Sequence, residues 1–241
     1  MLKCFVAWLH NWQPLVGATV ALIAALIAVY FGYRNTTRSL DHAGKLETWR
    51  RSRKHAAVRA VLPLALAQVL HYAERSARAL DELVNACVGE ELPPNTAPEN
   101  LAQPLPSETL KALADFIEYS DDVDVSVVEA TVAWIQIHDS RLRGLIEDNH
   151  DPSGTRMVLR TGIMARIIDA ASIYAGAAAV FEYARRQREQ LPHTLTWDAV
   201  TRALGNMHFF DDEYPGLHEM LALREAQSAG PFERLREGLP A

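Results

Sequence analysis

Cysteine is scarce in this sequence: Cys4 and Cys87 are the only two among 241 residues. Two cysteines exclude a disulfide-rich scaffold and any zinc site built from several thiolates. Glycine and proline number only 12 each, and 49% of the residues are hydrophobic. The composition therefore predicts a folded chain that is neither fibrous nor disordered.

Recognisable catalytic motifs are also missing. The sequence contains no glycine-rich phosphate loop, no nucleophile elbow and no paired-carboxylate signature. Metal-ligand side chains gather at 208–213 and at His218, but without a metal-binding spacing, so we expect a solvated acidic turn there. We predict no enzyme activity, no cofactor and no metal site.

Charge is distributed unevenly along the chain. Residues 1–33 hold one charged side chain, Lys3, whereas 34–59 hold eight Lys/Arg against two acidic residues. Residues 60–241 hold 15 basic against 28 acidic side chains. A nucleic-acid-binding protein carries basic charge on its folded domain, so we predict no nucleic-acid partner. The layout instead indicates a membrane anchor, a basic segment and an acidic domain.

A transmembrane helix is predicted over 14–33. The 19 residues from Leu15 to Tyr33 are uncharged. At about 1.5 Å per residue they span the roughly 30 Å hydrocarbon core of a bilayer. Two alternatives would leave no retained span. A cleaved signal peptide carries positive charge before its apolar run, unlike this sequence, and a buried helix of a soluble protein is usually shorter.

The flanking charges predict the orientation of this helix. Only Lys3 precedes it, whereas seven basic residues follow it between Arg34 and Lys54. The positive-inside rule places the short segment 1–13 outside and the rest of the chain in the cytoplasm. We therefore expect a single-pass protein of the cell inner membrane.

Small residues recur along one side of the predicted span. They are three or four positions apart, which lines them on one helix face and permits close approach of a second helix. They are Gly17, Ala21, Ala24, Ala28 and Gly32. This face predicts a homodimer, and the alternative is an alanine-rich composition without a packing role.

The segment 45–54 (KLETWRRSRK) is strongly basic and follows the span closely. Each basic residue near anionic lipid headgroups contributes about 1 kcal/mol of attraction. We predict that Trp49 and its basic neighbours contact the membrane surface. These neighbours are Arg50, Arg51, Arg53 and Lys54. The alternative is that they serve only as the topology signal.

The rest of the chain predicts an all-α fold. Residues 34–89 form a basic helix that leads into the first bundle helix, with a kink or break at Pro63. The buried side of that helix has spacings of four and three, through Leu62, Leu66, Val69, Ala73, Ser76, Leu80, Leu83 and Cys87. Prolines mark 90–106 as an ordered loop or a flexible linker.

Residues 107–241 predict an antiparallel helical bundle. Helices are expected from Ser107 as the cap to Tyr119, from the aspartates at 121–124 to Asn149, and then over 155–190, 197–207 and 219–227. The apolar stretch 170–181 has only 12 uncharged residues. We assign it to the bundle core, and the alternative is a second span.

Two carboxylates fall at positions predicted to be buried. Asp139 interrupts an apolar seam, and Asp169 lies on the alanine-rich helix. A buried carboxylate is costly unless it is paired. We expect Asp139 to pair with Arg143 or with an arginine of a neighbouring helix, and Asp169 to pair with Arg166. The alternative is that either carboxylate is functional.

Residues 11–15 (NWQPL), the alanine-rich span, the Tyr-Arg exit, the Arg-rich helix and residues 60–80 (AVLPLALAQVLHYAERSARAL) form a distinctive arrangement. In this arrangement the chain resembles a group of uncharacterised proteobacterial single-span inner-membrane proteins. The resemblance covers residues 11–88. It implies a bacterial inner-membrane location and no particular activity.

Two functions fit these features. The first is a membrane-tethered cytoplasmic interaction or scaffold module that holds an unidentified protein partner near the bilayer. The alternative is a membrane-bound signalling or defence component whose bundle senses a ligand or the state of the membrane. A buried pocket lined by Asp139, Asp169 and a histidine would favour the alternative.

Overall fold

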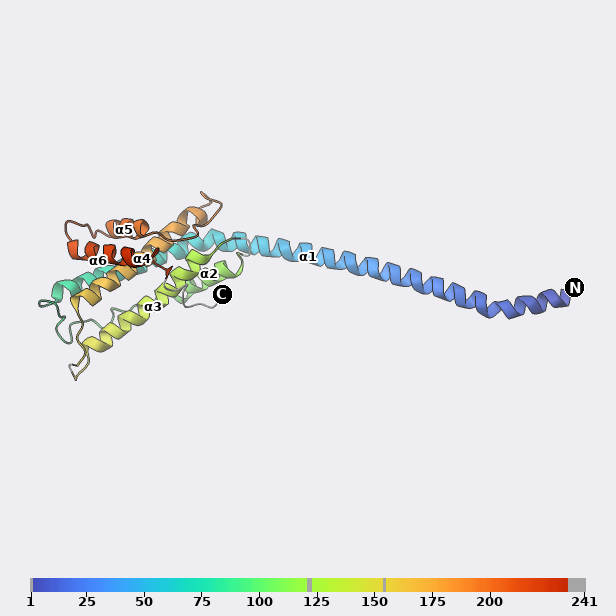
Figure 1. Ribbon diagram of the computed structural model, residues 1–241, viewed down its shortest axis with the longest axis horizontal. Helices are drawn as coiled ribbons and strands as arrows, with labels where there is room; N and C mark the ends of the chain where they lie inside the picture. The colour runs from blue at the N-terminus through green and yellow to red at the C-terminus, as the bar shows by residue number, and fades with distance from the viewer. Residues whose placement is uncertain (1, 121–122, 154, 234–241) are drawn as a thin grey trace. The chain divides into compact units, whose positions relative to one another are not determined.

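The computed structural model describes residues 2–120, 123–153 and 155–233, and its regular structure is helical. The helices of these residues are α1 (Leu2–Ala86), α2 (Ser107–Glu118), α3 (Ser126–Asn149), α4 (Arg160–Ala184), α5 (Trp197–Asn206) and α6 (Pro215–Gln227) (Figure 1). Within the described ranges, strand-like pairing is limited to isolated bridges from Glu91 to Val88 and Leu159. The predicted all-α fold is confirmed.

The chain divides into two compact units, Met1–Arg53 and Lys54–Ala241, and α1 contributes to both. In the first unit, every side chain from Gly17 to Arg53 is exposed. Helix α1 begins at Leu2, so Pro14 lies inside the helix and not at its first turn. Residues 2–13 contain no glycine or proline that would prevent a helix from forming ahead of Pro14.

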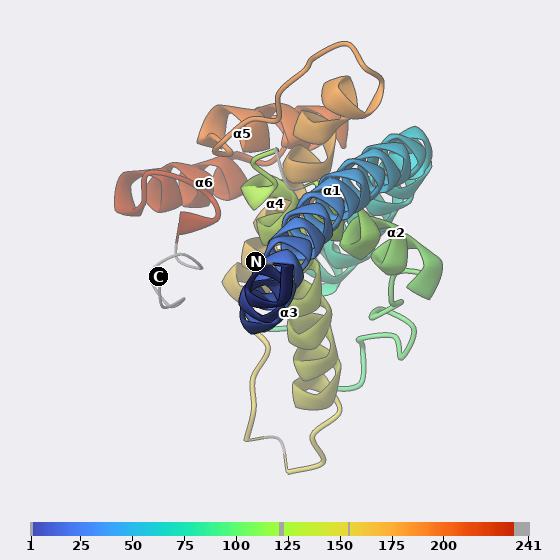
Figure 2. The ribbon, with the colours of Figure 1, turned by 90° about the vertical axis from the view of Figure 1, so that its right-hand side faces the viewer.

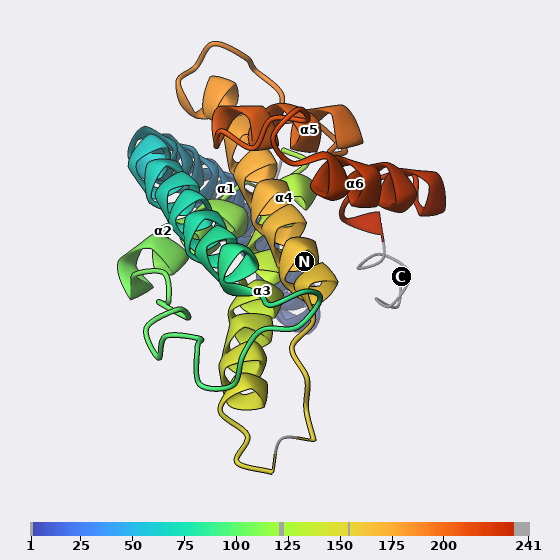
Figure 3. The same cartoon turned by 90° about the vertical axis from the view of Figure 1, so that its left-hand side faces the viewer.

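The core of the second unit is formed by α4 and the helices around it. Fourteen of the 25 residues of α4 are buried, which makes α4 its central helix. On α1, the predicted seam from Leu62 to Leu83 is buried throughout, and Cys87, just past the helix end, is half-buried. Helix α2 lies on one side of this core, and α5 and α6 lie on another (Figures 2 and 3).

Contacts along α4 define the helix directions in the second unit. Nε of Arg59, early in the α1 part, donates to the carbonyl of Tyr183, and the amide of Arg160 donates to Glu90. Helix α4 is therefore antiparallel to α1. It is also antiparallel to α3, because the chain turns back between them, so α1 and α3 run the same way (Figure 3). The bundle is mixed and not uniformly antiparallel.

Residues 87–106 explain this mixed arrangement. They carry the chain back along the unit, and α2 then leads into α3 (Figure 3). Four apolar side chains of this segment are buried: Leu92, Ala97, Leu101 and Leu105. Asn149 at the end of α3 donates to Pro93 O over 2.9 Å and accepts from Ala97 N over 2.7 Å. The segment is thus an ordered loop and not a flexible linker.

Several helix limits differ from the sequence prediction. Helix α1 does not break at Pro63. The adjacent Leu62 and nearby Leu66 are buried in the core, and their burial offsets the cost of a proline in a helix, about 3 kcal/mol. Pro106, and not Ser107, is the N-cap of α2. Helix α4 is shorter than 155–190, and α6 begins earlier, at Pro215, since proline suits the first turn. The predicted aspartates 121 and 122 lie outside the described residues.

The sequence spacing predicts a buried seam on α3 through Val125, Val128, Val132, Ile135, Asp139, Leu142 and Ile146. The observed buried face is rotated from this seam by about one residue. Thr131, His138 and Leu145 are buried, whereas Val132, Asp139 and Ile146 lie at the edge. One cause is the close approach of α3 to α4 at Gly176. A Cβ on Gly176 would lie 2.3 Å from Oγ1 of Thr131, so a larger residue there would require Thr131 or the helices to shift.

Two helical stretches of the described residues are long and apolar enough to cross a membrane. One begins at Gly17, and none of its most apolar window is buried inside the protein. The other is α4, whose window is 67% buried. Packing against the other helices therefore covers α4, as expected for the core helix of a bundle.

Candidate functional site

The exposed part of α1 over 17–33 is the most unusual surface of the described chain. Nine large apolar or aromatic side chains there are each more than half exposed: Val20, Leu22, Ile23, Leu26, Ile27, Val29, Tyr30, Phe31 and Tyr33. Covering one such aliphatic side chain is worth about 1.5–3 kcal/mol. This helix therefore presents an apolar surface suited to lipid.

The small residues of the predicted packing face are all exposed on this helix. They are Gly17, Ala21, Ala24, Ala28 and Gly32. No heavy atom would lie within 4 Å of a Cβ built on Gly17 or Gly32. The face is therefore open to a neighbouring helix.

The basic segment after the span makes contacts along its own helix. Nε of Arg51 lies 3.2 Å from the carboxylate of Glu47, one turn earlier. The guanidinium of Arg53 lies 4.8 Å from the centre of the Trp49 ring. The guanidinium of Arg51 and one face of the Trp49 ring, which we predicted to meet the membrane surface, are therefore already in contact with side chains of the same helix. Arg50 is exposed.

Lys54, the first residue of the second unit, contacts Tyr119, the C-cap residue of α2. Its ammonium donates to the hydroxyl of Tyr119 and lies 3.8 Å from the centre of that ring. The hydrogen bond to Tyr119 raises the pKa of Lys54. Lys54 therefore has a contact within the folded unit that the sequence did not suggest.

The helical rise separates these basic residues from the apolar stretch. At about 1.5 Å per residue, Arg50 lies about 26 Å along α1 from Tyr33, whereas Arg34 and Arg38 lie within about 8 Å. Headgroup attraction decays over a Debye length of about 8–10 Å. With the helix axis along the membrane normal, Arg34 and Arg38 are thus better placed to meet headgroups than Arg50, Arg51 and Arg53.

A buried ionic cluster joins three helices of the second unit. Asp169 on α4 is 1% exposed, and its two oxygens accept from Arg141 of α3 over 2.6 Å and Arg224 of α6 over 2.8 Å. Arg224 also donates to Ala165 O over 3.1 Å. The predicted pairing with Arg166 is wrong, because both partners come from neighbouring helices.

Uncompensated polar atoms surround this cluster. Nε of Arg166 is buried without a hydrogen-bond partner, and burial lowers the pKa of its guanidinium. His138 on α3 is completely buried, and neither ring nitrogen has a partner. Burial lowers the pKa of His138 to about 4, while Asp169 opposes this shift. His138 is thus neutral near pH 7 and packs edge-on against Tyr72, with ring centres 6.0 Å apart.

Asp139, the residue after His138, lies at the edge of the core. Its side chain is 20% exposed, and it forms the predicted ion pair with Arg143, at 2.7 Å. The burial of its neighbour His138 was not predicted. The signal for His138 was its place in the spacing of Thr131, Ile135 and Leu142, which marks the buried face of α3.

The chemistry of the cluster is structural. Both oxygens of Asp169 are engaged by guanidinium groups, so the carboxylate has little capacity left to bind a cation. In the described structure Asp139 pairs with Arg143, whereas Asp169 pairs with Arg141 and Arg224, and His138 makes no hydrogen bond to either carboxylate. We infer that the ion pairs of this cluster connect α3, α4 and α6.

A separate cavity of about 260 Å³ opens near the start of α3, among residues that include Ser126, His193, Gly230, Phe232 and Glu233. Nδ1 of His193 lies 2.6 Å from the carboxylate of Asp124, and this hydrogen bond lowers the pKa of Asp124 to about 2. Oγ of Ser126 donates to the backbone carbonyl of His193 and not to its ring. The three side chains thus lack the hydrogen-bond order of a catalytic triad.

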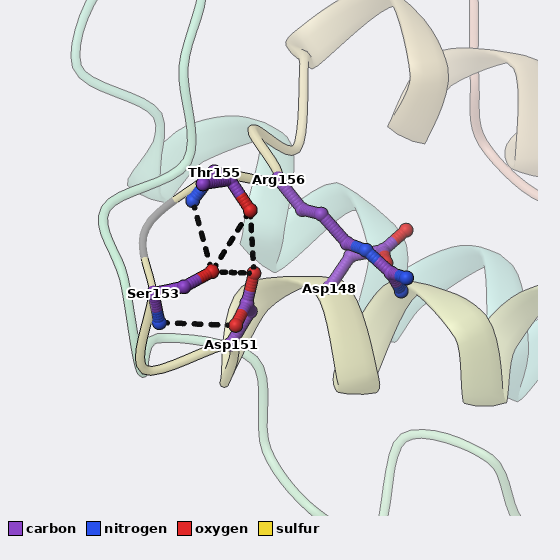
Figure 4. Close-up of polar contacts among 5 residues, drawn as sticks. All are labelled: Asp148, Asp151, Ser153, Thr155 and Arg156. Carbon is purple, nitrogen blue, oxygen red and sulfur yellow. Dashed lines mark hydrogen bonds and ion pairs between the residues drawn. The ribbon is translucent and has the colours of Figure 1, made fainter.

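The turn between α3 and α4 gathers polar side chains (Figure 4). Asp151 accepts from the amide of Ser153 over 3.0 Å, from its hydroxyl over 2.6 Å and from Thr155 over 3.1 Å. Arg156 pairs with Asp148 at 2.9 Å. These bonds are internal to the turn and fix its shape. Across the described ranges, no group of three or more acidic, histidine or cysteine side chains is placed to hold a metal ion.

Comparison of the chain with protein-family models, with curated proteins and with solved structures finds no match.

Proposed function

We propose that this protein is a single-pass membrane protein whose helical second unit lies in the cytoplasm and docks a protein partner near the bilayer. One observation carries the proposal: the apolar side chains of α1 between Gly17 and Tyr33 are exposed on a continuous helix. A bilayer covers such a helix on all sides, because its backbone hydrogen bonds are satisfied internally.

The energetics support lipid as the covering medium. Each Leu, Ile, Val or Phe in the centre of a span favours insertion by about 0.3–0.6 kcal/mol, and no charged residue interrupts 15–33. The excess of basic residues after Tyr33 supports the orientation with the C-terminus in the cytoplasm. The resemblance over residues 11–88 supports the inner membrane of a bacterium.

A docking role is supported by the character of the second unit. Its buried carboxylate is neutralised by two arginines, and its Asp124–His193 pair does not engage the nearby serine hydroxyl through the ring. The unit is a well-packed helical body on a membrane helix, which suits an interaction module.

Paired arginine substitutions test the anchor. Ile23→Arg with Leu26→Arg places two charges at the centre of the span, each costing about 2.5–3.5 kcal/mol. The matched control is Leu40→Arg with Leu46→Arg, two exposed leucines of the same helix beyond the span. Alkaline carbonate extraction of cell membranes should release the first variant, while the control and the wild type stay in the pellet.

Fusions at the C-terminus test the orientation. A cytoplasmic C-terminus predicts a bright fluorescent-protein fusion and an inactive alkaline phosphatase fusion. Active phosphatase would overturn the orientation, and release of the wild-type chain by carbonate would overturn the membrane anchor.

A further inference from the structure

The part of α1 in the second unit has two helical seams on opposite sides. The inner seam, which includes Leu62, Leu66 and Val69, is buried in the core. The opposite side carries a second set with spacings of three, four and three, which we name the outer face: Ala57, Ala60, Leu64 and Ala67, with Val61 beside them. Leu64 is 69% exposed and Val61 is 53% exposed.

The outer face differs from an ordinary solvated helix surface. From Ala56 to Leu70 the sequence has a single charged residue, Arg59. Nη2 of Arg59 donates to the carbonyl of Tyr183 over 2.6 Å, so this charge is turned toward α4. Apart from Gln68, the exposed side of the helix is thus apolar and built mainly of small residues. Such a surface permits close approach of another helix.

We propose that the outer face of α1 packs against the outer face of a second copy of this chain. The spacing of three and four residues continues beyond Ala67 through His71, Glu74 and Arg78. That spacing is the packing pattern of two parallel helices. The proposal goes beyond the docking role and uses the proposed membrane anchor only to make the two helices parallel.

The mixed charges beside the outer face favour a second copy of the chain over a strongly acidic or strongly basic partner. Beyond Ala67 the same side of α1 borders a hollow of about 240 Å³, lined by His71, Glu74, Arg75, Arg78, Ala79 and Glu82. Arg78 is already paired with Glu74 at 2.8 Å, so the surface has both signs and little net charge. In two parallel helices in register, Glu74 of one copy lies about one helical turn from Arg78 of the other, so a second copy can pair these charges, whereas a strongly acidic or basic partner would meet like charges.

A parallel two-fold dimer also makes a specific geometric demand. Its interface is isologous, so a residue at the centre of the outer face lies next to the same residue of the partner. The small-residue face of the first unit, from Gly17 to Gly32, is an independent indication that α1 approaches another helix.

Cysteine cross-linking tests this demand in the full chain reconstituted alone into lipid vesicles. The background carries Cys4→Ser and Cys87→Ala, and Leu64→Cys is compared with Leu223→Cys on α6, a leucine that is 64% exposed. Mild oxidation should convert Leu64→Cys to a disulfide-linked dimer at least about tenfold faster, because only there are the two Cα atoms held within disulfide range. Equal rates, or no dimer at Leu64→Cys, would overturn the proposal.

A second pair of variants separates the dimer from lipid contact. Leu64→Glu should convert the reconstituted protein to monomers in single-molecule photobleaching, and Leu223→Glu should not. A fluorescent label at position 64 should be shielded from brominated lipids. Strong quenching by those lipids would show that the outer face lies on the bilayer and would overturn the proposal. Carbonate extraction of each variant reports separately on membrane anchoring.

Discussion

Oδ1 of Asp169 on α4 lies 2.8 Å from Nη1 of Arg224 on α6, and only 1% of the aspartate side chain is exposed. Arg141 of α3 occupies the other oxygen at 2.6 Å. A carboxylate enclosed in this way is stable only while both cations stay in place, because an unpaired buried charge is expensive. Three helices therefore depend on one side chain.

Replacing Asp169 should strongly destabilise the second unit. Asp169→Asn leaves two arginines without their counter-ion, and loss of one member of a buried ion pair costs about 3–5 kcal/mol. The matched control is Asp139→Asn: its pair with Arg143 lies at the edge of the core, with the arginine 59% exposed, and should be worth less than about 1 kcal/mol. Urea unfolding of the full chain in detergent, followed by far-UV circular dichroism, measures both. Equal midpoints for the two variants would contradict the structural role of Asp169.

His138 should make stability depend on pH in a defined window. Its pKa is lowered by burial to about 4 in the folded chain, against an ordinary value of 6.5. The unfolded chain therefore binds more protons between these values, so stability falls as the pH falls from about 6.5 to about 4. At about pH 4 this difference in pKa corresponds to a loss of about 3 kcal/mol in the free energy of unfolding.

Comparison with His138→Phe isolates this effect. The variant keeps a ring at the buried position and removes the titrating group, so its unfolding midpoint should vary less between pH 6.5 and pH 4. Asp124 does not interfere, since its lowered pKa of about 2 places its own loss of stability at lower pH. Identical pH profiles for wild type and variant would rule out His138 as the source.

Gly176 should not tolerate a side chain. In Gly176→Ala the new Cβ would meet Oγ1 of Thr131 at 2.3 Å, and overpacking of this kind costs about 1–3 kcal/mol. Gly162→Ala in the same helix has open space around it and should be neutral or stabilising by up to about 1 kcal/mol. Thermal unfolding compares the two, and Thr131→Ala should restore part of the stability lost in Gly176→Ala.

The sequence predicted the features that depend on local pattern. The all-α class and the buried seam of α1 from Leu62 to Leu83 follow from helical spacing and are observed. Thr196 caps α5 by accepting from the amide of Ala199, as expected for a threonine directly before a helix. The ion pair of Asp139 with Arg143 also follows from spacing, because residues four apart share a helix face.

Features that depend on packing between distant segments could not be predicted. Arg224 is 55 residues from Asp169 in sequence, and no local pattern around either residue predicts that they form an ion pair. The exact buried face of α3 was missed because α3 contacts helices on two sides, which makes a one-residue rotation compatible with the same apolar pattern. His193 and Asp124 meet across 69 residues for the same reason.

The basic segment 45–54 should lie beyond the headgroups of the bilayer. Ser39 and Ser52 are both exposed on α1, about 9 Å and about 28 Å along the helix from Tyr33. In a full chain without native cysteines, a fluorescent label at Ser39→Cys should be quenched by lipids that carry a quencher on the headgroup. A label at Ser52→Cys should be quenched little, because a helix that continues straight from the span carries it beyond the headgroups.

Adding anionic lipid should not change this difference between the two labels. Replacing Arg34 and Arg38 by Gln should reduce the attraction to anionic headgroups more than replacing Arg50 and Arg51 by Gln. If anionic lipid instead brings the Ser52 label into quenching range, and replacing Arg50, Arg51 and Arg53 by Gln abolishes that effect, then the helix bends onto the membrane and the originally predicted contact of these residues holds.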